Sequence, residues 1–539
     1  MSNLSLALFS GLLLVFAFPD WGLWSLGWVG VAPLIMAIVR EGRFWRSFVL
    51  GTVTGTVFYI GTSHWITYSM HNYGEVPLWL SYCLLILICF LVGVFTGLFA
   101  GLLGFAIKRF GGWAILAAPV IWATTEWLRL TVGGMGWNAL GYSQAFQPAV
   151  IQIARWGGVY LVSALLVAVS AALVFATIYL ERRRGFVVLT VIGLLATAAV
   201  IYGQSFRSEE DDKETVSLAV IQPNVPVAGD WDDPQFVKKL FDMHIELSEQ
   251  AIQQASKDAL NGKTTGGLPH HLAQPDRAAG NRAVDMVVWP ESSMNFDYER
   301  DANLRRQLAE FAQRNKVYLL LNGWGFSDTV ERKIYNSAML IAPSGERVSR
   351  YDKIALMPFG EYVPARGWIP FMDRIPALVG DITPGNTITL MDVAGARLGT
   401  PICFDAAVPS LMGQMRREGA SSLIQLSNEA WFGPSAVARQ MLAQAVFRAV
   451  ENDVEFIRST NTGASARIDR YGLVYDETKQ FETETRLWKI KKGNADGDLT
   501  FYTRHGDVFV ITCAVASALM MIAAVVYGIV LKNRQKLER

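Results

Sequence analysis

The stretch Asp285-Met-Val-Val-Trp-Pro-Glu291 is a short apolar run that ends in a proline and a carboxylate. An apolar run of this length that contains β-branched and aromatic residues predicts a buried strand. Pro290 cannot donate a hydrogen bond to a sheet, so we expect it to end the strand and to leave Glu291 at the carboxyl edge.

Similar patterns recur on both sides of this stretch. Strands are predicted at 216–222, 285–291, 317–324, 335–342, 398–404 and 422–427, and helices at 234–255, 301–315 and 435–452. This alternation indicates an α/β or layered α+β enzyme scaffold. A polar run at 257–282, rich in Gly, Pro and Ala, predicts a surface insertion. It contains His270 and His271, but no further ligands follow at a spacing suited to a metal, so no metal site is predicted.

The rest of the chain is far more apolar. The 539 residues are 52% hydrophobic and only 18% charged, with a mean hydropathy of +0.27. Residues 1–203 hold only fifteen Asp, Glu, Lys or Arg residues and 507–539 only six. We therefore predict a transmembrane domain at 1–203, a water-soluble domain at 204–506, and a final membrane helix with a basic tail at 507–539. This composition excludes a disordered or collagen-like chain, and the net charge of +1 gives no reason to expect nucleic acid as a partner.

Eight apolar runs are candidates for crossing a hydrocarbon core of about 30 Å. They lie at 4–18, 22–39, 47–69, 78–107, 113–130, 155–180, 186–203 and 508–531. A signal peptide is the rival interpretation of the first run, but it lacks a basic n-region and a small-residue cleavage site, which favours a retained helix.

Basic residues gather in alternate loops, namely Arg40, Arg43, Arg46, Lys108, Arg109, Arg182, Arg183, Arg184, Lys532, Arg534, Lys536 and Arg539. Because such residues face the cytoplasm, both termini are expected there and the 204–506 domain on the opposite side. In a Gram-negative cell this corresponds to the inner membrane with a periplasmic domain. Within the fifth run, Glu126 and Arg129 lie three residues apart, and either an intrahelical ion pair or a functional role would explain them.

Only one of the four cysteines, Cys403, lies in the soluble block. The other three fall in apolar runs, where a small buried side chain is the ordinary role. A lone cysteine in an oxidising compartment cannot form an intradomain disulfide, so Cys403 is either buried and inert or a working thiol.

Three predicted strand ends carry reactive side chains. Glu291 ends the first, Lys353 follows Arg350-Tyr-Asp, and Cys403 lies in Thr400-Pro-Ile-Cys-Phe-Asp405. These groups suit acyl transfer through a thioester: a thiol needs a base, a buried carboxylate can act as that base, and an ammonium can stabilise an oxyanion. Each residue alone also has an ordinary structural explanation, as a solvated strand end, a surface lysine or a core cysteine.

The order Trp-Pro-Glu291, then Lys353, then Ile-Cys403-Phe-Asp resembles the Glu-Lys-Cys triad of the nitrilase superfamily, whose fold is an αββα sandwich. Together with eight spans, the chain resembles the apolipoprotein N-acyltransferase family over nearly its whole length. Further matching segments are Phe18-Pro-Asp-Trp-Gly-Leu-Trp24, Gly141-Tyr-Ser-Gln144, Gln222-Pro-Asn224, Tyr335-Asn-Ser337, Phe359-Gly-Glu-Tyr-Val-Pro364, Ser427-Asn-Glu-Ala-Trp-Phe-Gly433, Arg458-Ser-Thr-Asn-Thr-Gly463 and Tyr502-Thr-Arg-His-Gly-Asp507.

The resemblance implies a role for each matching residue. Cys403 would be the nucleophile, Glu291 the general base and Lys353 the oxyanion partner. Glu361 matches the family's second essential carboxylate, and Trp231, Asn336 and Trp431 match supporting or gating positions. Phe404 and Asp405 stand where the family often has Tyr-Glu, which places acceptor positioning and rate in question but leaves the triad intact.

The resemblance also implies the reaction: a fatty acyl chain moves from a phospholipid, typically phosphatidylethanolamine, through a Cys403 thioester to the α-amino group of a diacylglyceryl-modified apolipoprotein. No cofactor or metal is implied, and a monomer is expected. Residues 365–372, with Trp368 and Phe371, suggest an arm resting in the membrane interface, although an ordinary packing loop would also explain them.

Two rival functions use the same residues differently. A membrane-tethered amidase or nitrilase-type hydrolase would have the same triad with water as acceptor, but it needs neither eight spans nor an apolar arm. A transporter or scaffold has little support, because it would not need Glu291, Lys353 and Cys403 in this order.

Overall fold

The computed structural model describes residues 1–178, 183–206, 215–231, 233–260, 283–292, 297–327, 333–364, 366, 377, 380–492 and 498–537. The chain forms two compact units. The helical unit comprises Met1–Arg207, Ser435–Glu451 and Thr500–Arg539, and the α/β unit comprises Ser208–Pro434 and Asn452–Leu499. Two segments that were predicted to belong to the soluble domain, Ser435–Glu451 and residues 500–506, group with the helical unit instead.

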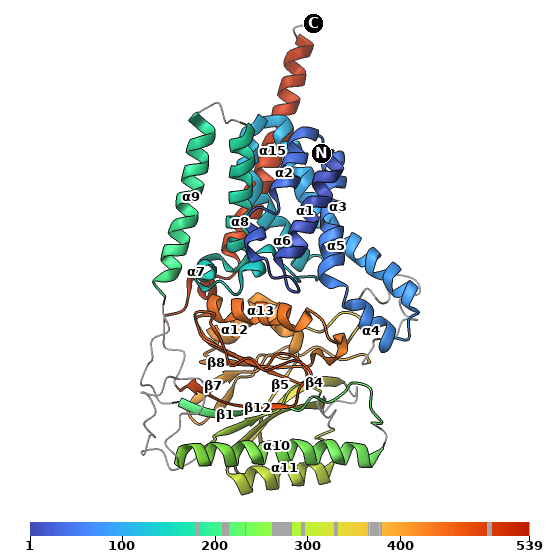
Figure 1. Ribbon diagram of the computed structural model, residues 1–539, viewed down its shortest axis with the longest axis vertical. Coiled ribbons are helices and arrows are strands. Elements are labelled where there is room, and N and C mark those ends of the chain that lie inside the picture. The colour runs from blue at the N-terminus through green and yellow to red at the C-terminus, as the bar shows by residue number, and fades with distance from the viewer. Residues whose placement is uncertain are drawn as a thin grey trace. The chain divides into compact units, whose positions relative to one another are not determined.

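Helices occur within each of the eight apolar runs of the sequence (Figure 1). Their bounds are α1 (Asn3–Ala17), η1 (Trp24–Trp28), α2 (Ala32–Glu41), α3 (Phe44–Ser63), α4 (Ile66–Asn72), α5 (Leu78–Phe110), η2 (Gly111–Ala117), α6 (Ala118–Thr131), η3 (Leu140–Gln144), α7 (Pro148–Ile151), α8 (Ala154–Ile178), α9 (Arg183–Gln204), α13 (Val437–Asn452), α14 (Phe501–His505) and α15 (Val508–Leu537).

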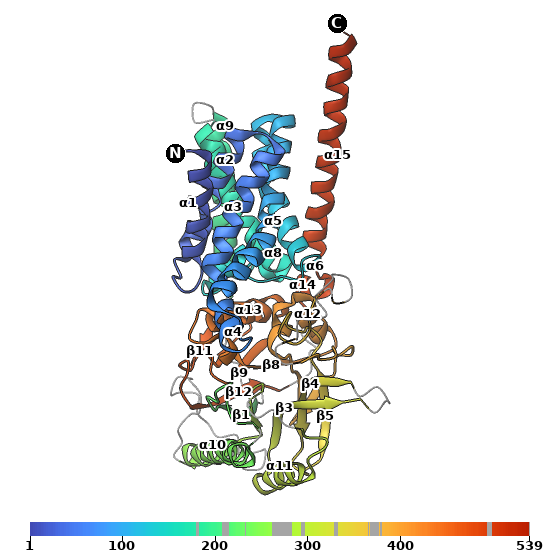
Figure 2. The same cartoon turned by 90° about the vertical axis from the view of Figure 1, so that its right-hand side faces the viewer.

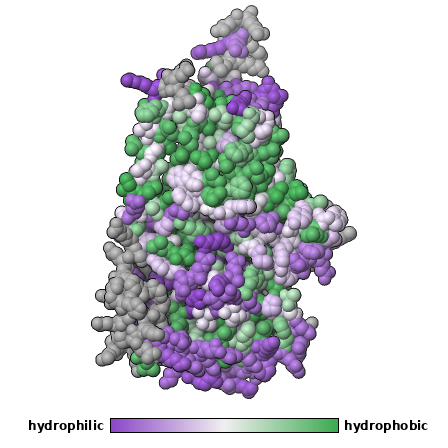
Figure 3. Space-filling model, in the orientation of Figure 1, coloured by the Kyte–Doolittle hydropathy of each residue, from purple (hydrophilic) through white to green (hydrophobic). Residues whose placement is uncertain are grey.

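Five described segments are long and apolar enough to cross a membrane: Trp24–Glu41, Leu78–Thr131, Ala154–Ile178, Arg183–Gln204 and Val508–Gln535. The helix α1 is apolar but shorter. Much of the surface of α9 and α15 is exposed aliphatic side chain, and Figure 3 shows broad hydrophobic areas over this unit. Helices that are apolar nearly all round indicate a lipid environment. Figure 2 shows the long helix α15 extending beyond the other helices of its unit.

Small residues allow α3 and α5 to pack closely. A Cβ on Gly97 would lie 2.2 Å from Thr52 Oγ1, and one on Gly51 would lie 2.5 Å from the Ala100 Cβ. Any larger side chain at these positions would push the helices apart. Close approach through small residues is a common way for helices to associate in lipid, where the hydrophobic effect gives no driving force.

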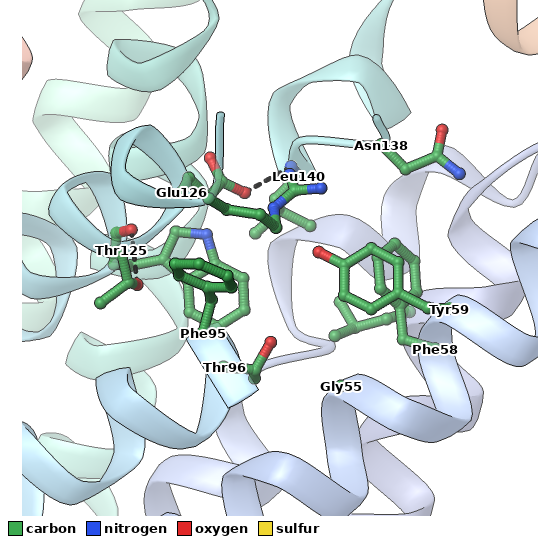
Figure 4. Close-up of a pocket in the computed structure, with 12 residues that line it drawn as sticks. Gly55, Phe58, Tyr59, Phe95, Thr96, Thr125, Glu126, Asn138 and Leu140 are labelled. Atoms are coloured by element: carbon green, nitrogen blue, oxygen red, sulfur yellow. Dashed lines mark hydrogen bonds between the residues drawn. The ribbon is translucent and has the colours of Figure 1, made fainter. Parts of the chain in front are cut away.

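Glu126 and Arg129 of α6 bond to the loop that follows their helix. Glu126 Oε1 accepts a hydrogen bond from the Leu140 N–H at 2.7 Å, and Arg129 Nη1 donates to the Trp137 carbonyl oxygen. Both residues line a cavity of about 20 Å³ beside Tyr59 and Asn138 (Figure 4). In the described part of this unit the two charges do not pair directly, so the predicted intrahelical ion pair is replaced by two backbone contacts.

The helix α13 is held in the helical unit by buried polar side chains. Gln440 is 2% exposed; its Oε1 accepts hydrogen bonds from the indoles of Trp65 and Trp137, and its Nε2 donates to the Thr62 carbonyl oxygen. The Glu451 carboxylate accepts the Val159 N–H at the start of α8 at 2.9 Å. The polar side of α13, which resembles a solvated face in the sequence, is therefore buried.

Two six-stranded sheets make up the core of the α/β unit. The first has the order β12-β1-β2-β3-β4-β5 and the second β11-β10-β9-β8-β7-β6. The central pairs β1–β2, β2–β3, β7–β8 and β8–β9 are parallel. The strands are β1 (Thr215–Gln222), β2 (Met286–Val288), β3 (Tyr318–Phe326), β4 (Ile334–Ile341), β5 (Arg347–Asp352), β6 (Met391–Val393), β7 (Ala396–Gly399), β8 (Ser422–Ser427), β9 (Glu455–Thr460), β10 (Ala466–Ile468), β11 (Val474–Tyr475) and β12 (Glu484–Lys491).

Helices cover the outer faces of the stacked sheets. Figures 1 and 2 show α10 (Pro234–Leu260) and α11 (Ala302–Asn315) on the first sheet, and α12 (Pro409–Arg417) on the side of the second. A buried cluster that includes Leu308, Phe311 and Leu319 fills the space between the first pair of helices and the sheet. This layering agrees with the predicted α/β sandwich.

Two predicted strands end earlier than expected. The run 285–291 is a strand only at Met286–Val288, and the run predicted at 398–404 is a strand only to Gly399. Beyond Gly399 a single bridge joins Ile402 to Leu426. Pro290 and Pro401 lack the N–H that a continued ladder needs. The predicted insertion at 257–282 lies outside the described residues from 261 onward, and its first residues end α10.

Candidate active site

The three strand ends that the sequence singled out all lie in the α/β unit. Glu291 follows β2 after Trp289 and Pro290, Lys353 directly follows β5, and Cys403 opens the 3₁₀ helix η6 (Cys403–Ala407) after β7. Glu291 is 5% exposed and Lys353 2% exposed. Because the two sheets are stacked, side chains at these ends can meet between the layers.

Lys353 lies between two carboxylates. Its Nζ is 3.3 Å from Glu291 Oε1, 2.9 Å from Glu361 Oε1 and 2.8 Å from Glu361 Oε2. Glu361 is anchored from the other side, because its Oε2 accepts the Met357 N–H at 2.8 Å. One cation thus faces two acids in a buried setting, so the three groups together carry an excess of one negative charge when all are ionised.

Asn336 on β4 joins the same two carboxylates. Its Nδ2 donates to Glu291 Oε1 at 2.8 Å and to Glu361 Oε1 at 2.9 Å. Its Oδ1 accepts from Asn322 Nδ2 of β3 at 2.7 Å, which fixes the orientation of the amide. Asn322 was not among the predicted site residues; the available signal was a polar residue directly after the apolar run Tyr318–Leu321.

Burial and neighbouring charges set the protonation states of this cluster. Burial raises the pKa of Glu291, and Lys353 opposes that rise. Burial lowers the pKa of Lys353, but Glu291 and Glu361 outweigh it and raise that pKa well above its ordinary value. Lys353 therefore stays an ammonium, while the carboxyl of Glu291 is poised to accept a proton nearer to neutral pH.

The thiol of Cys403 is influenced by the same groups. Burial raises its pKa well above the usual range; Glu291 raises it further and Lys353 lowers it. A thiol in this environment is protonated at rest, so it needs a base before it can attack. The backbone of Cys403 has φ +46°, the left-handed region that a residue with a Cβ seldom occupies.

Asp405 connects the Cys403 turn to the segment around Lys353. Its carboxylate accepts the Ile402 N–H at 2.9 Å, the Ala355 N–H at 2.7 Å and the Tyr351 hydroxyl at 2.9 Å. Tyr351 and Ala355 lie two residues before and after Lys353. Burial raises the pKa of Asp405 to about 6, although the two N–H donors lower it. Phe404, beside it, is 8% exposed.

The two predicted tryptophans, Trp231 and Trp431, also belong to the α/β unit. Trp231 donates from Nε1 to the Val227 carbonyl oxygen at 3.0 Å and packs edge-on against Phe236 at 5.5 Å. Trp431 lies in η7 (Glu429–Phe432), half-buried. Of the predicted interfacial arm at 365–372, only Arg366 is described, and it contacts Asp381.

The described residues contain no group of three or more His, Cys, Asp or Glu side chains arranged to hold a metal ion. Cys403, Glu291 and Lys353 supply a thiol, an acid–base carboxyl and a fixed ammonium.

Two family descriptions match the chain. "Apolipoprotein N-acyltransferase N-terminal domain" matches residues 10–172, and "Carbon-nitrogen hydrolase" matches residues 217–496, more than half of the chain. Among solved structures, the chain is similar to Nit3 of Saccharomyces cerevisiae, a member of branch 10 of the nitrilase superfamily, with 17% identity, a TM-score of 0.36, and coverage of 56% of this chain and 98% of that one.

Curated relatives named apolipoprotein N-acyltransferase match along most of the sequence. The Geobacter metallireducens protein is 32% identical over 529 residues, covering 96% of this chain and 94% of the relative. The Allorhizobium ampelinum protein is 31% identical and covers 68% of each chain. The Chlorobaculum tepidum protein is 25% identical and covers 96% of each. The chain belongs to the apolipoprotein N-acyltransferase family.

Proposed function

We propose that this protein transfers a fatty acyl chain from a phospholipid, typically phosphatidylethanolamine, to the α-amino group of the diacylglyceryl-modified cysteine of apolipoproteins. Family membership supports the reaction class. The observation that carries the chemistry is the buried cluster in which Lys353 contacts both Glu291 and Glu361, because it supplies a base and a fixed cation beside the Cys403 thiol.

The first half-reaction forms the thioester. Glu291 takes the proton of the Cys403 thiol as the sulfur attacks the ester carbonyl carbon of the phospholipid. The ammonium of Lys353, held by Glu361, stabilises the oxyanion that forms on the carbonyl oxygen. The carbon–oxygen bond to glycerol then breaks, and Glu291 gives its proton to the leaving glycerol oxygen, which becomes the free hydroxyl of the lysophospholipid.

The second half-reaction passes the acyl group to an amine. The free α-amino group of the acceptor attacks the thioester carbon, Glu291 takes a proton from the nitrogen, and the thiolate leaves and is reprotonated. Asn336 keeps Glu291 oriented through both halves, because its amide is itself fixed by Asn322. No metal or cofactor is required for either step.

A chain with two lipid substrates belongs at a membrane, and the apolar helices of the first unit fit this requirement. We propose eight spans in a bacterial inner membrane, with both termini cytoplasmic, catalytic residues on the periplasmic side, and a monomeric protein. The alternation of basic loops supports the orientation. Reporter fusions at Gly42 and in the segment after Gln204 test it, since they should report opposite sides of the membrane.

The choice of acceptor distinguishes acyl transfer from hydrolysis. The purified membrane protein is supplied with a phospholipid that has a tagged sn-1 chain, with or without a diacylglyceryl peptide that has a free amino terminus. We expect the tag to move to the peptide as an amide, and the same peptide with an acetylated amine to receive none. Release of tagged fatty acid alone, in the presence of either peptide, would instead identify a membrane-tethered hydrolase.

A further inference from the structure

A second buried network in the α/β unit reaches Cys403 from the side of the neighbouring strands. Gln425 on β8 donates from Nε2 to the carbonyl oxygen of Cys403 at 2.7 Å. Gln425 is fully buried, and its Nε2 contact is with the backbone of the nucleophile itself. The network thus acts on the peptide unit that follows the reactive thiol.

Arg458 on β9 fixes Gln425. Its Nε donates to Gln425 Oε1 at 3.1 Å, so the amide of Gln425 is held with its nitrogen toward Cys403. Arg458 Nη1 also donates to the Ala464 carbonyl oxygen at 3.3 Å, and the guanidinium is fully buried. An arginine is suited to this role because its planar fork presents several donors in fixed directions.

Glu429 balances the buried charge of Arg458. The two side chains form an ion pair through Glu429 Oε1, which also accepts the Ser427 hydroxyl at 2.8 Å. A Cβ on Gly463 would lie 2.6 Å from Glu429 Oε2, so only a glycine allows the carboxylate this position. A buried charge of this kind is costly unless it is paired, and here the pair is linked to the nucleophile through a single amide.

The contact matters because Cys403 occupies a strained backbone conformation. At φ +46° an L-residue with a side chain is unfavourable, and such conformations persist only where surrounding contacts hold them. The carbonyl of Cys403 and the N–H of Phe404 belong to one planar peptide unit. A bond that fixes the carbonyl therefore fixes the direction of that N–H and restricts the ψ rotation of Cys403, from whose Cα the thiol side chain extends.

We propose that Gln425 and Arg458 are positioning residues that hold the Cys403 peptide unit in the left-handed conformation needed for attack, with Glu429 balancing the charge of Arg458. The expected effect of these residues on turnover rests on the proposed thioester chemistry. Their expected effect on the reactivity of the Cys403 thiol does not depend on any lipid substrate.

The most informative variant is Gln425→Glu. It keeps the side-chain shape and the oxygen that accepts from Arg458, but it replaces the Nε2 donor with an oxygen that faces the Cys403 carbonyl. Arg458→Lys keeps the charge but loses the fork that bonds to Gln425 and Glu429 together. Gln414→Glu makes the same chemical change on an exposed position of α12 and is the matched control. All variants are made in the full-length chain.

Two measurements test the proposal. The first is the rate at which tagged phospholipid acylates Cys403, as maximal rate and as half-saturating lipid concentration. The second is the rate of alkylation of Cys403 by iodoacetamide between pH 6 and 10, read by mass spectrometry of its peptide, with Cys403→Ala as blank. Rates are normalised to folded protein, so that simple loss of stability does not enter.

We expect Gln425→Glu and Arg458→Lys to lower the maximal acylation rate about 100-fold, the cost of misplacing a reacting group by about 1 Å, with little change in half-saturation. The pH profile of alkylation should shift in both variants and stay native in Gln414→Glu. Acylation within threefold of native together with an unchanged alkylation profile would overturn the proposal. If the native protein forms no acyl adduct, the proposed function fails, and the alkylation profiles alone decide whether the network positions the thiol.

Discussion

Two buried acid–base pairs in this protein have the same residue classes and different surroundings. In the helical unit, Glu126 and Arg129 each bond to a backbone group of the following loop. In the α/β unit, Glu291 and Lys353 bond to each other and to further side chains, with Glu361 as a second acid on the same cation.

The difference separates a structural role from a reactive one. One oxygen of Glu126 and one nitrogen of Arg129 bond to backbone groups, and these contacts hold a turn of the chain. The cluster around Lys353 instead has more acids than cations, and it lies where its charge acts on a thiol. Burial raises the pKa of Glu291, which favours proton uptake by this carboxyl.

The largest effect is expected from Glu291→Gln. The amide can still accept a hydrogen bond from Asn336 but cannot take the proton of the thiol. We expect the rate of thioester formation on Cys403 to fall about 10³-fold or more, measured by the amount of hydroxylamine-sensitive label over time. An unchanged rate would show that another group is the base.

The next effect is expected from Lys353→Met, which removes the cation and leaves two facing acids. Without a fixed charge for the oxyanion, the rate should fall about 10²- to 10³-fold. Thermal unfolding of the same variant serves as the control for folding. A rate within tenfold of native would mean that backbone donors alone stabilise the intermediate.

Asp405 gives a prediction on pH. The pKa of its carboxyl is about 6 in the folded protein and about 3.9 in an unfolded chain, so folding favours its protonated form. The contribution of Asp405 to the free energy of unfolding is therefore largest below pH 4. It is lost as the pH rises through 6, a change of about 3 kcal/mol. In Asp405→Asn this part of the pH dependence should vanish. Parallel curves of unfolding free energy for the variant and the native protein between pH 4 and 7 would contradict it.

The smallest effect on activity is expected from Glu126→Gln. The variant keeps an acceptor for the Leu140 N–H, so acyl transfer should stay within threefold of native while stability falls by about 1 kcal/mol. Transfer rate and melting temperature are measured on the same preparation. A loss of transfer comparable to that of Glu291→Gln would remove the contrast between the two pairs.

Sequence patterns predicted part of the sheets: β8 matches its predicted bounds, whereas β6, β9, β10, β11 and β12 were not predicted. Glu291 does lie within hydrogen-bond distance of both Lys353 and Asn336. Periodicity could not reveal that α13 groups with the helical unit, because Gln440 and Glu451 resemble a solvated face until their partners from distant segments are known.

The second network was hidden for a similar reason. Gln425 and Arg458 lie on neighbouring strands 33 residues apart and meet only through sheet pairing. The left-handed backbone at Cys403 also leaves no sequence signal, because a cysteine rather than a glycine occupies it. Prolines 290 and 401 did carry a signal, and they explain why both strands end before the reactive residues.

In the proposed reaction the acyl group passes through a thioester on Cys403. The most direct measurement is peptide mass spectrometry of the protein after brief incubation with tagged phospholipid and no acceptor, with Cys83, the exposed cysteine of α5, as an internal comparison. We expect a tagged, hydroxylamine-sensitive acyl group on the Cys403 peptide, none on the Cys83 peptide, and none in Cys403→Ala. Transfer to the acceptor amine by Cys403→Ala at the native rate, without any acyl-enzyme, would contradict it.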